Sequence, residues 1–214
     1  MDKKIMKIYD AGDHDRAIHL LIKKIDNEPK NVDNYLQLAT FLIEQNSAQQ
    51  ALELLQKAQV VVDQPEKSSY DIAVCYYMLG EFEKSLKLID SLPNDDETLY
   101  QKSLIFMKMG QYQKALAFAL TIKKQDNKIL ELLGDIWLSL GELKAAHDSF
   151  AKVPEKQRSA KVNFLLGLTI FDKDQKQAEQ FFSEAKKLDK NYVAQAEKQY
   201  SAIAKLIRGK DGSN

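Results

Sequence analysis

The sequence predicts an all-α protein: a right-handed α-solenoid of about six helix-turn-helix repeats, followed by a C-terminal capping helix. Three observations support this fold class. Apolar residues recur at helical spacing, as in residues 69–89, where Ile72, Tyr76 and Leu79 share one stripe. Single glycines such as Gly80 end the apolar stripes. The connections are only a few residues long, so successive helices form antiparallel hairpins.

An internal repeat runs along most of the chain. Its turn residues are separated by 34, 34, 30 and 31 positions: Gly12, Asn46, Gly80, Gly110 and Gly141. Five positions after each turn residue comes a small residue: Ala17, Ala51, Ser85, Ala115 and Ala146. Four positions later follows a larger apolar residue, with Ala119 as the exception: Leu21, Leu55, Ile89 and Phe150. Small residues let two helices approach closely and large ones fill the space beside them.

This pattern resembles the tetratricopeptide repeat, a helix hairpin of about 34 residues. One good copy spans residues 35–58 and carries Tyr35, Leu38, Ala39, Leu42, Ala51, Leu55 and Ala58. Another spans residues 130–153 and carries Leu130, Leu133, Gly134, Trp137, Gly141, Ala146 and Phe150. A sixth copy fits residues 164–187 with a shortened turn. The resemblance covers about residues 2–189, and it implies a concave groove lined by the first helix of each repeat.

The repeats are expected at about 2–31, 32–64, 66–94, 96–126, 127–156 and 160–189, within one domain over residues 1–208. In repeat one, a short helix over 3–9 precedes a second helix over 13–26 that stops before Pro29. In repeat two, Asn46 takes the place of the turn glycine, because asparagine tolerates left-handed backbone. In repeats three and five, Pro93 and Pro154 end the second helix early.

Repeat four has Lys102 where a leucine is usual. After repeat six, Val193, Ala196 and Tyr200 lie at helical spacing with a polar opposite face, which is typical of a capping helix over 191–207. Residues 209–214 are expected to be a disordered tail.

Composition argues against several function classes. Lys plus Arg and Asp plus Glu both total 31, so the formal net charge is zero. A chain without a basic excess is not expected to bind nucleic acid or an anionic membrane. No stretch has the apolar length of a membrane-spanning helix, and the N-terminus lacks the apolar core of a signal peptide. The expected location is therefore the cytoplasm.

No catalytic or metal-binding motif is present in the sequence. His14 and His19 are five residues apart, which places them on different faces of a helix, and His147 is distant in sequence. The single cysteine, Cys75, falls on an apolar helix and is expected to be a buried structural thiol. The chain is therefore not expected to be an enzyme, to hold a metal or to need a cofactor.

The resemblance assigns the groove to positions on the first helices that the core does not need. Carried over, these are Leu36, Thr40, Tyr70, Val74, Tyr77, Met78, Tyr100, Leu104, Met107, Glu131, Asp135, Phe164, Leu168 and Phe171. Such an aromatic and methionine-rich strip is typical of a protein-binding surface. It lacks the lysines and asparagines with which related repeats grip a C-terminal carboxylate. The expected ligand is an apolar peptide or protein segment, with a basic residue opposite Glu131 and Asp135.

Three functions remain open from the sequence. The first is a non-enzymatic adaptor that binds a protein segment in the groove. The second is a structural homo-oligomer, such as a homodimer, in which the groove or the ends of the array are self-buried. The third is a peptide-sensing regulatory module without a DNA-binding domain, since the repeats begin almost at Met1 and leave no room for one.

Overall fold

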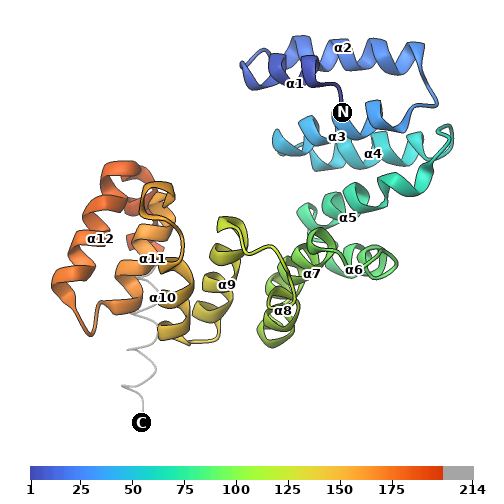
Figure 1. Cartoon of the computed structure of the whole chain (residues 1–214). Helices are drawn as coiled ribbons and strands as arrows, with labels where there is room; N and C mark the ends of the chain where they lie inside the picture. The colour runs from blue at the N-terminus through green and yellow to red at the C-terminus, as the bar shows by residue number, and fades with distance from the viewer. Residues whose placement is uncertain (200–214) are drawn as a thin grey trace. The chain divides into compact units, whose positions relative to one another are not determined.

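The computed structural model describes residues 1–199 as an all-α fold, in which helices pack in pairs that follow each other in sequence (Figure 1). It divides into two compact units, Met1–Gln111 and Tyr112–Asn214. Unit 1 contains α1 (Lys3–Asp10), α2 (His14–Asn27), α3 (Val32–Glu44), α4 (Ala48–Ala58), α5 (Ser69–Met78), α6 (Phe82–Asp90) and α7 (Asp96–Lys108). Unit 2 contains α8 (Tyr112–Ala119), α9 (Asn127–Ser139), α10 (Leu143–Ala151), α11 (Ala160–Ile170) and α12 (Gln175–Leu188).

Short 3₁₀ helices, Pro65–Ser68 and Glu155–Gln157, precede α5 and α11. Residues 190–199 are also helical, and they form the described part of the expected capping helix. The remainder of that helix and the expected disordered tail lie outside the described residues. The prediction of one continuous domain over residues 1–208 stays a prediction.

The hairpin turns adopt the conformation that the repeat predicts. Each of the five turn residues has positive φ: Gly12 at 90°, Asn46 at 57°, Gly80 at 80°, Gly110 at 71° and Gly141 at 80°. At Gly80 the turn is closed by the amide of Glu81, which donates to the carbonyl of Tyr76 at 2.9 Å. Left-handed backbone costs little free energy for glycine and is tolerated by asparagine. The five turn residues are therefore confirmed as helix stops.

The core of unit 1 is a series of clusters, each shared by successive hairpins. Phe41 of α3 is fully buried, and its ring stacks on Tyr9 of α1 with a centroid separation of 3.8 Å. Leu55 of α4 and Cys75 of α5 are fully buried members of the next cluster. Each hairpin thus needs its neighbour to cover its apolar face, as expected for a helical repeat.

Unit 2 has its own core around Phe150 of α10, which is fully buried together with Leu166 of α11 and Ala185 of α12. Val193 and Ala196, from the helical residues 190–199, are buried members of the same cluster. The start of the expected capping helix therefore docks its apolar side against the last hairpin.

The expected early helix ends are confirmed: α6 stops at Asp90 and α10 stops at Ala151. The contacts of Lys102 explain why a lysine can stand where the repeat usually has a leucine. It is buried at 5% exposure, and its Nζ lies 2.9 Å from an Asp90 carboxylate oxygen and 2.9 Å from Asn94 Oδ1. Its aliphatic stem fills the place of a leucine, while its ammonium group ties α7 to the turn that Pro93 imposes.

Candidate protein-binding surface

The surface of interest in unit 1 lies on the first helices of successive hairpins, with α5 in contact with both α3 and α7. We define the aromatic face as the seven side chains of α5 and α7 that the resemblance assigned to the groove. They are Tyr70, Val74, Tyr77, Met78, Tyr100, Leu104 and Met107. Met78 is 38% exposed and the other six are half-buried, so the structure leaves each of them partly open to solvent.

The helical repeat of α5 explains why one face stays open. At 3.6 residues per turn, Tyr70, Val74, Tyr77 and Met78 fall within an arc of about 120°. Ile72, Ala73 and Cys75 lie outside this arc and are buried. Tyr77 is nevertheless held by a neighbouring ring, because it packs against Phe82 with a centroid separation of 5.9 Å.

On α3 the two expected groove residues, Leu36 and Thr40, are also half-buried. The Thr40 hydroxyl donates to the Leu36 carbonyl at 3.0 Å, within the same helix. This hydroxyl is therefore satisfied within the helix and needs no ligand.

An acidic corner adjoins the aromatic face where α5 and α7 begin. Asp71, on α5, is half-buried, and Glu97, in the first turn of α7, is exposed. Burial, and then the charge of Glu97, raises the pKa of Asp71 to about 6. The same surroundings raise the pKa of Tyr70 to about 12, first through burial and then through the charge of Glu97. Within residues 1–199 neither carboxylate forms an ion pair.

In unit 2 the acidic groove positions have an internal cation. Asp135 of α9 is half-buried, and its carboxylate lies 2.5 Å from Lys161 Nζ of α11. Burial raises the pKa of both Glu131 and Asp135, and the charge of Lys161 opposes that rise at each of them. The basic residue expected opposite these two carboxylates is therefore supplied by the protein itself.

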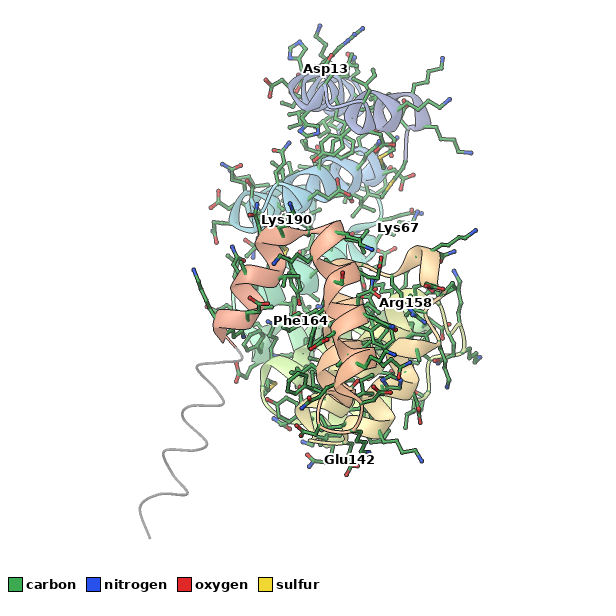
Figure 2. All side chains as sticks on the ribbon, turned by 90° about the vertical axis from the view of Figure 1, so that its left-hand side faces the viewer. Asp13, Lys67, Glu142, Arg158, Phe164 and Lys190 are labelled. Carbon is green, nitrogen blue, oxygen red and sulfur yellow. The ribbon has the colours of Figure 1, made fainter. Side chains whose placement is uncertain are left out.

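The assignment of Phe164 to an open groove is wrong. Phe164 is only 4% exposed, and it lies between α12 and the helical residues 190–199 (Figure 2). Its ring packs against Phe182 at 5.3 Å and against the edge of Tyr192 at 6.2 Å. The docked start of the C-terminal helix covers this position. Leu168 is half-buried, and Phe171 remains 43% exposed.

Two charged residues of these surfaces were missed by the sequence analysis, namely Glu97 and Lys161. Both lie in the first turn of a first helix, six residues before the small residue, Ser103 or Gly167, that packs near the hairpin axis. This shared register is a signal that the sequence contains. The residues with which their charges interact, Asp71 for Glu97 and Asp135 for Lys161, belong to the preceding hairpin and become visible only in the structure.

The side chains of Cys75, His14 and His147 are buried or make structural contacts. Across residues 1–199, no group of three His, Cys, Asp or Glu side chains is placed to hold a metal ion. Cys75 is buried, and burial raises the pKa of its thiol to about 12, so it stays a thiol rather than a reactive thiolate. His14 stacks on Tyr9 and His147 contacts the Thr169 hydroxyl at 3.0 Å, both of which are structural contacts. No helix in this part of the chain has the length and hydrophobicity needed to cross a bilayer.

The antiparallel hairpins, their positive-φ turns and their shared cores define a helical repeat protein. A family model described as "Tetratricopeptide repeat" matches residues 9–66. A TPR repeat-containing protein of Methanocaldococcus jannaschii is 26% identical over 70% of this chain, although the match spans only 28% of that relative. The recurring unit is therefore the tetratricopeptide repeat, and the chain is a tetratricopeptide repeat protein.

Solved structures support the same fold. PilW, a type IV pilus biogenesis factor, is similar with a TM-score of 0.74 and 17% identity, covering 86% of this chain and 90% of that one. YrrB, a TPR protein with an unusual peptide-binding site, is similar with a TM-score of 0.56 and 17% identity, covering 83% of this chain and 97% of that one. At such identities the likeness concerns the fold.

Proposed function

We propose that the chain is a non-enzymatic interaction module that binds a peptide or protein segment on the first helices of its repeats. Tetratricopeptide repeat domains generally mediate protein–protein interactions, and the scaffold is typically non-enzymatic. The observation that carries the proposal for this chain is the aromatic face, whose seven large side chains are left partly open by the fold.

The physical argument is one of area and adaptability. Tyrosine and methionine expose much apolar area and lose little conformational entropy, or adapt their shape, when a partner covers them. The apolar side chains of this face on α5 and α7 cost free energy while they are exposed to water, so covering them with an apolar segment is favourable. The peptide-binding site reported for YrrB supports this use of the fold.

The test is a pull-down with the full chain as bait. We expect wild type to capture a partner that the variant Tyr77→Asp with Leu104→Asp does not capture, because two carboxylates would then be buried on binding. A matched control, Ile22→Asp with Val60→Asp, adds the same charge at exposed apolar positions away from the face. Circular dichroism checks that all three proteins are folded.

Light scattering separates this function from the structural homo-oligomer. If the aromatic face is a self-interface, wild type forms dimers and the Tyr77→Asp with Leu104→Asp variant is monomeric. A monomeric wild type that loses its partner only in this variant supports the adaptor function. The cytoplasmic location stays a prediction from the sequence.

A further inference from the structure

We propose that unit 2 carries a second binding site, a hollow beside the start of α11 that holds one apolar residue of an extended segment of a partner protein. Asn163 accepts a hydrogen bond from the N–H of that residue, Arg158 donates to its carbonyl group, and Phe181 packs against its side chain. None of these three residues belongs to the aromatic face or to the groove positions of the first helices. The inference therefore goes beyond the proposed function and does not depend on it.

The hollow has a volume of about 450 Å³ and is lined by the connection before α11, by α11 itself and by the C-terminal half of α12. This volume is within the range of sites that enclose a small ligand or one side chain of a larger one. Asn163 is buried, Phe181 is half-buried and Leu188 is 59% exposed. The lining therefore combines apolar side chains with a buried amide.

The repeat pattern explains why space remains at this place. In repeats two and five, the residue three positions before the Leu–Ala or Leu–Gly pair is large and buried, namely Tyr35 or Leu130. In repeat six the same position, three before Leu166, holds Asn163. A smaller side chain at a position that usually takes a large one leaves volume unfilled.

The buried amide of Asn163 has hydrogen-bonding capacity that the protein does not use. Its Nδ2 atom donates to the Ser159 carbonyl at 3.3 Å, and its Oδ1 atom accepts no hydrogen bond within residues 1–199. Asn163 is only 6% exposed, and an amide oxygen at such a position is normally paired. Because Asn163 lines the hollow, an N–H group of a ligand can pair with its oxygen there.

Arg158 supplies a donor to the same hollow. Its Nε and Nη2 atoms donate to the carbonyls of Val153 at 2.9 Å and Ala151 at 3.1 Å, which fixes the guanidinium group at the end of α10. Its Cζ atom lies 6.0 Å from the centroid of the Phe181 ring, so the side chain reaches α12 (Figure 2). A guanidinium group has five N–H donors, and those of Nη1 are left for a ligand carbonyl within the described part of the chain.

The protein contains an example of the pairing that we propose. Gln37 of α3 is buried, and its side-chain amide accepts from the Asp2 amide at 2.6 Å and donates to the Asp2 carbonyl at 3.0 Å. One residue in extended backbone directs its N–H and C=O to the same side, so both can be bound at one place. At Asn163 the amide nitrogen is already used, and Arg158 provides the donor instead.

The charges around the hollow do not select a strongly charged ligand. The exposed charged side chains of the lining are two cations and two anions: Lys156, Lys187, Glu155 and Glu184. A carboxylate can bind Arg158, but it has no N–H to offer the oxygen of Asn163. The Phe181 ring is held by the edge contact with His147 at 6.5 Å, so the apolar wall is formed before binding, which lowers the entropic cost.

The first test uses N-acetyl-L-leucine methylamide, which carries a leucine side chain and the N–H and C=O of one residue. Added to the isotope-labelled full chain, it is expected to shift the NMR signals of the Asn163 side-chain amide and the Arg158 Nε–H. An analogue with an ester oxygen in place of the leucine N–H should bind on the order of fivefold more weakly. Equal binding of the two compounds would overturn the inference, because the hollow would then bind only the apolar side chain.

The variant Asn163→Leu introduces the residue that repeat five has at this position, so it should fold, fill the hollow and abolish the shifts. Gln177→Leu adds the same side chain at an exposed position of α12 outside the hollow, and it should bind the probe as wild type does. Circular dichroism checks that both variants are folded. A folded Asn163→Leu protein that binds the probe with wild-type affinity would place the site elsewhere and overturn the inference. If this variant does not fold, the comparison of amide and ester on wild type still decides.

Two further compounds test the nature of the ligand. N-acetyl-L-leucine, which ends in a carboxylate, should bind more weakly than the methylamide, and tighter binding would indicate a site for a chain end instead. The capped tripeptide Ala-Leu-Ala should bind more tightly than the methylamide, because its flanking residues add contacts; no gain would indicate a small-molecule site. Either contrary result overturns the inference.

The outcomes are independent of the proposed function. The Tyr77→Asp with Leu104→Asp variant changes unit 1 alone and should bind the probe as wild type does. A wild type that captures its partner through the aromatic face but does not bind the probe would leave the proposed function standing and overturn this inference.

Discussion

At the scale of single residues, the two helices of a hairpin pack through pairs of residues, in which a small residue on one helix leaves room for a large one on the other. A Cβ atom added to Gly134 would lie 2.3 Å from the Phe150 ring, and one added to Gly167 would lie 2.6 Å from the Phe182 ring. In repeat two the equivalent small residue is an alanine, and the large one is aliphatic: Ala39 shares a core with Leu55. Glycine thus occurs where the partner is phenylalanine, because only glycine leaves room for the ring.

We therefore expect Gly134→Ala to destabilise the protein by about 1–3 kcal/mol, although alanine is the better helix former. The added methyl group has to displace the fully buried Phe150 ring. Urea unfolding measures the change. In the double variant Gly134→Ala with Phe150→Leu, which mimics the pair of repeat two, the loss should be smaller than the sum of the single losses. Additive losses would contradict the size match.

Asp71 should make the free energy of unfolding depend on pH. Its pKa is raised to about 6 in the folded chain, mainly by burial and then by Glu97. The folded state therefore binds this proton more tightly than the unfolded state. The stability that the group contributes is fully present below its unfolded pKa of about 4, and it is lost as the pH rises through 6.

We expect Asp71→Asn to raise the melting temperature at pH 8 and to have little effect at pH 4.5. Melting curves by circular dichroism at the two pH values measure the difference, with Asp10→Asn as an exposed control on α1. If Asp71→Asn lowered the melting temperature at pH 8, the carboxylate would have a stabilising partner instead.

At the scale of elements, the start of α7 is held by its own first turn and by Lys102. Asp95 caps the helix by accepting from the Thr98 amide at 2.9 Å, and the Thr98 hydroxyl donates to the Pro93 carbonyl at 2.6 Å. Lys102 adds its contacts to Asp90 and Asn94. The turn after α6 is thus tied to α7, which compensates for the short second helix.

Lys102→Ala should therefore cost about 1–3 kcal/mol and loosen this turn, because it removes both a buried stem and the ion pair. Hydrogen exchange measured by mass spectrometry should show faster exchange over residues 91–98. Lys87→Ala, at an exposed lysine of α6, is the control. Unchanged exchange over 91–98 would mean that the Asp95 cap alone holds the turn.

The sequence was sufficient for the parts of the fold that depend on local conformation. Asn46 and Gly80 could be assigned as helix stops because left-handed backbone restricts the choice of residue. Phe164 was misassigned because its exposure depends on where a later segment, with Tyr192, docks. The ion pair of Lys161 with Asp135 was missed for the same reason, since Asp135 belongs to another hairpin and no periodicity encodes that pairing.

At the scale of the whole molecule, the two units have separate cores, and the chain's single tryptophan, Trp137, packs against the core of unit 2. Repeat proteins owe their stability to contacts between neighbours, so distant parts can unfold at different denaturant concentrations. Tryptophan fluorescence should therefore report unit 2, while far-ultraviolet circular dichroism reports both units.

We expect Phe41→Leu, in unit 1, to shift the circular dichroism transition in urea and to leave the midpoint of Trp137 fluorescence unchanged. Gly134→Ala, in unit 2, should shift the fluorescence midpoint. Phe41 and Gly134 both belong to well-packed cores, so each variant controls for the other. Equal shifts of both signals in either variant would show that the chain unfolds as one cooperative system.

The size-matched pairs also bear on how such a chain can lengthen. Gly134 and Phe150 belong to one hairpin, as do Gly167 and Phe182, so duplication of a complete hairpin copies both halves of a match. A genetic crossover inside a turn, for example at Gly141, separates the two residues of a size-matched pair. The new hairpin can then combine a glycine with a leucine, or an alanine with a phenylalanine. Recombination is therefore best tolerated in the segments between hairpins, such as residues 59–68 and 152–159.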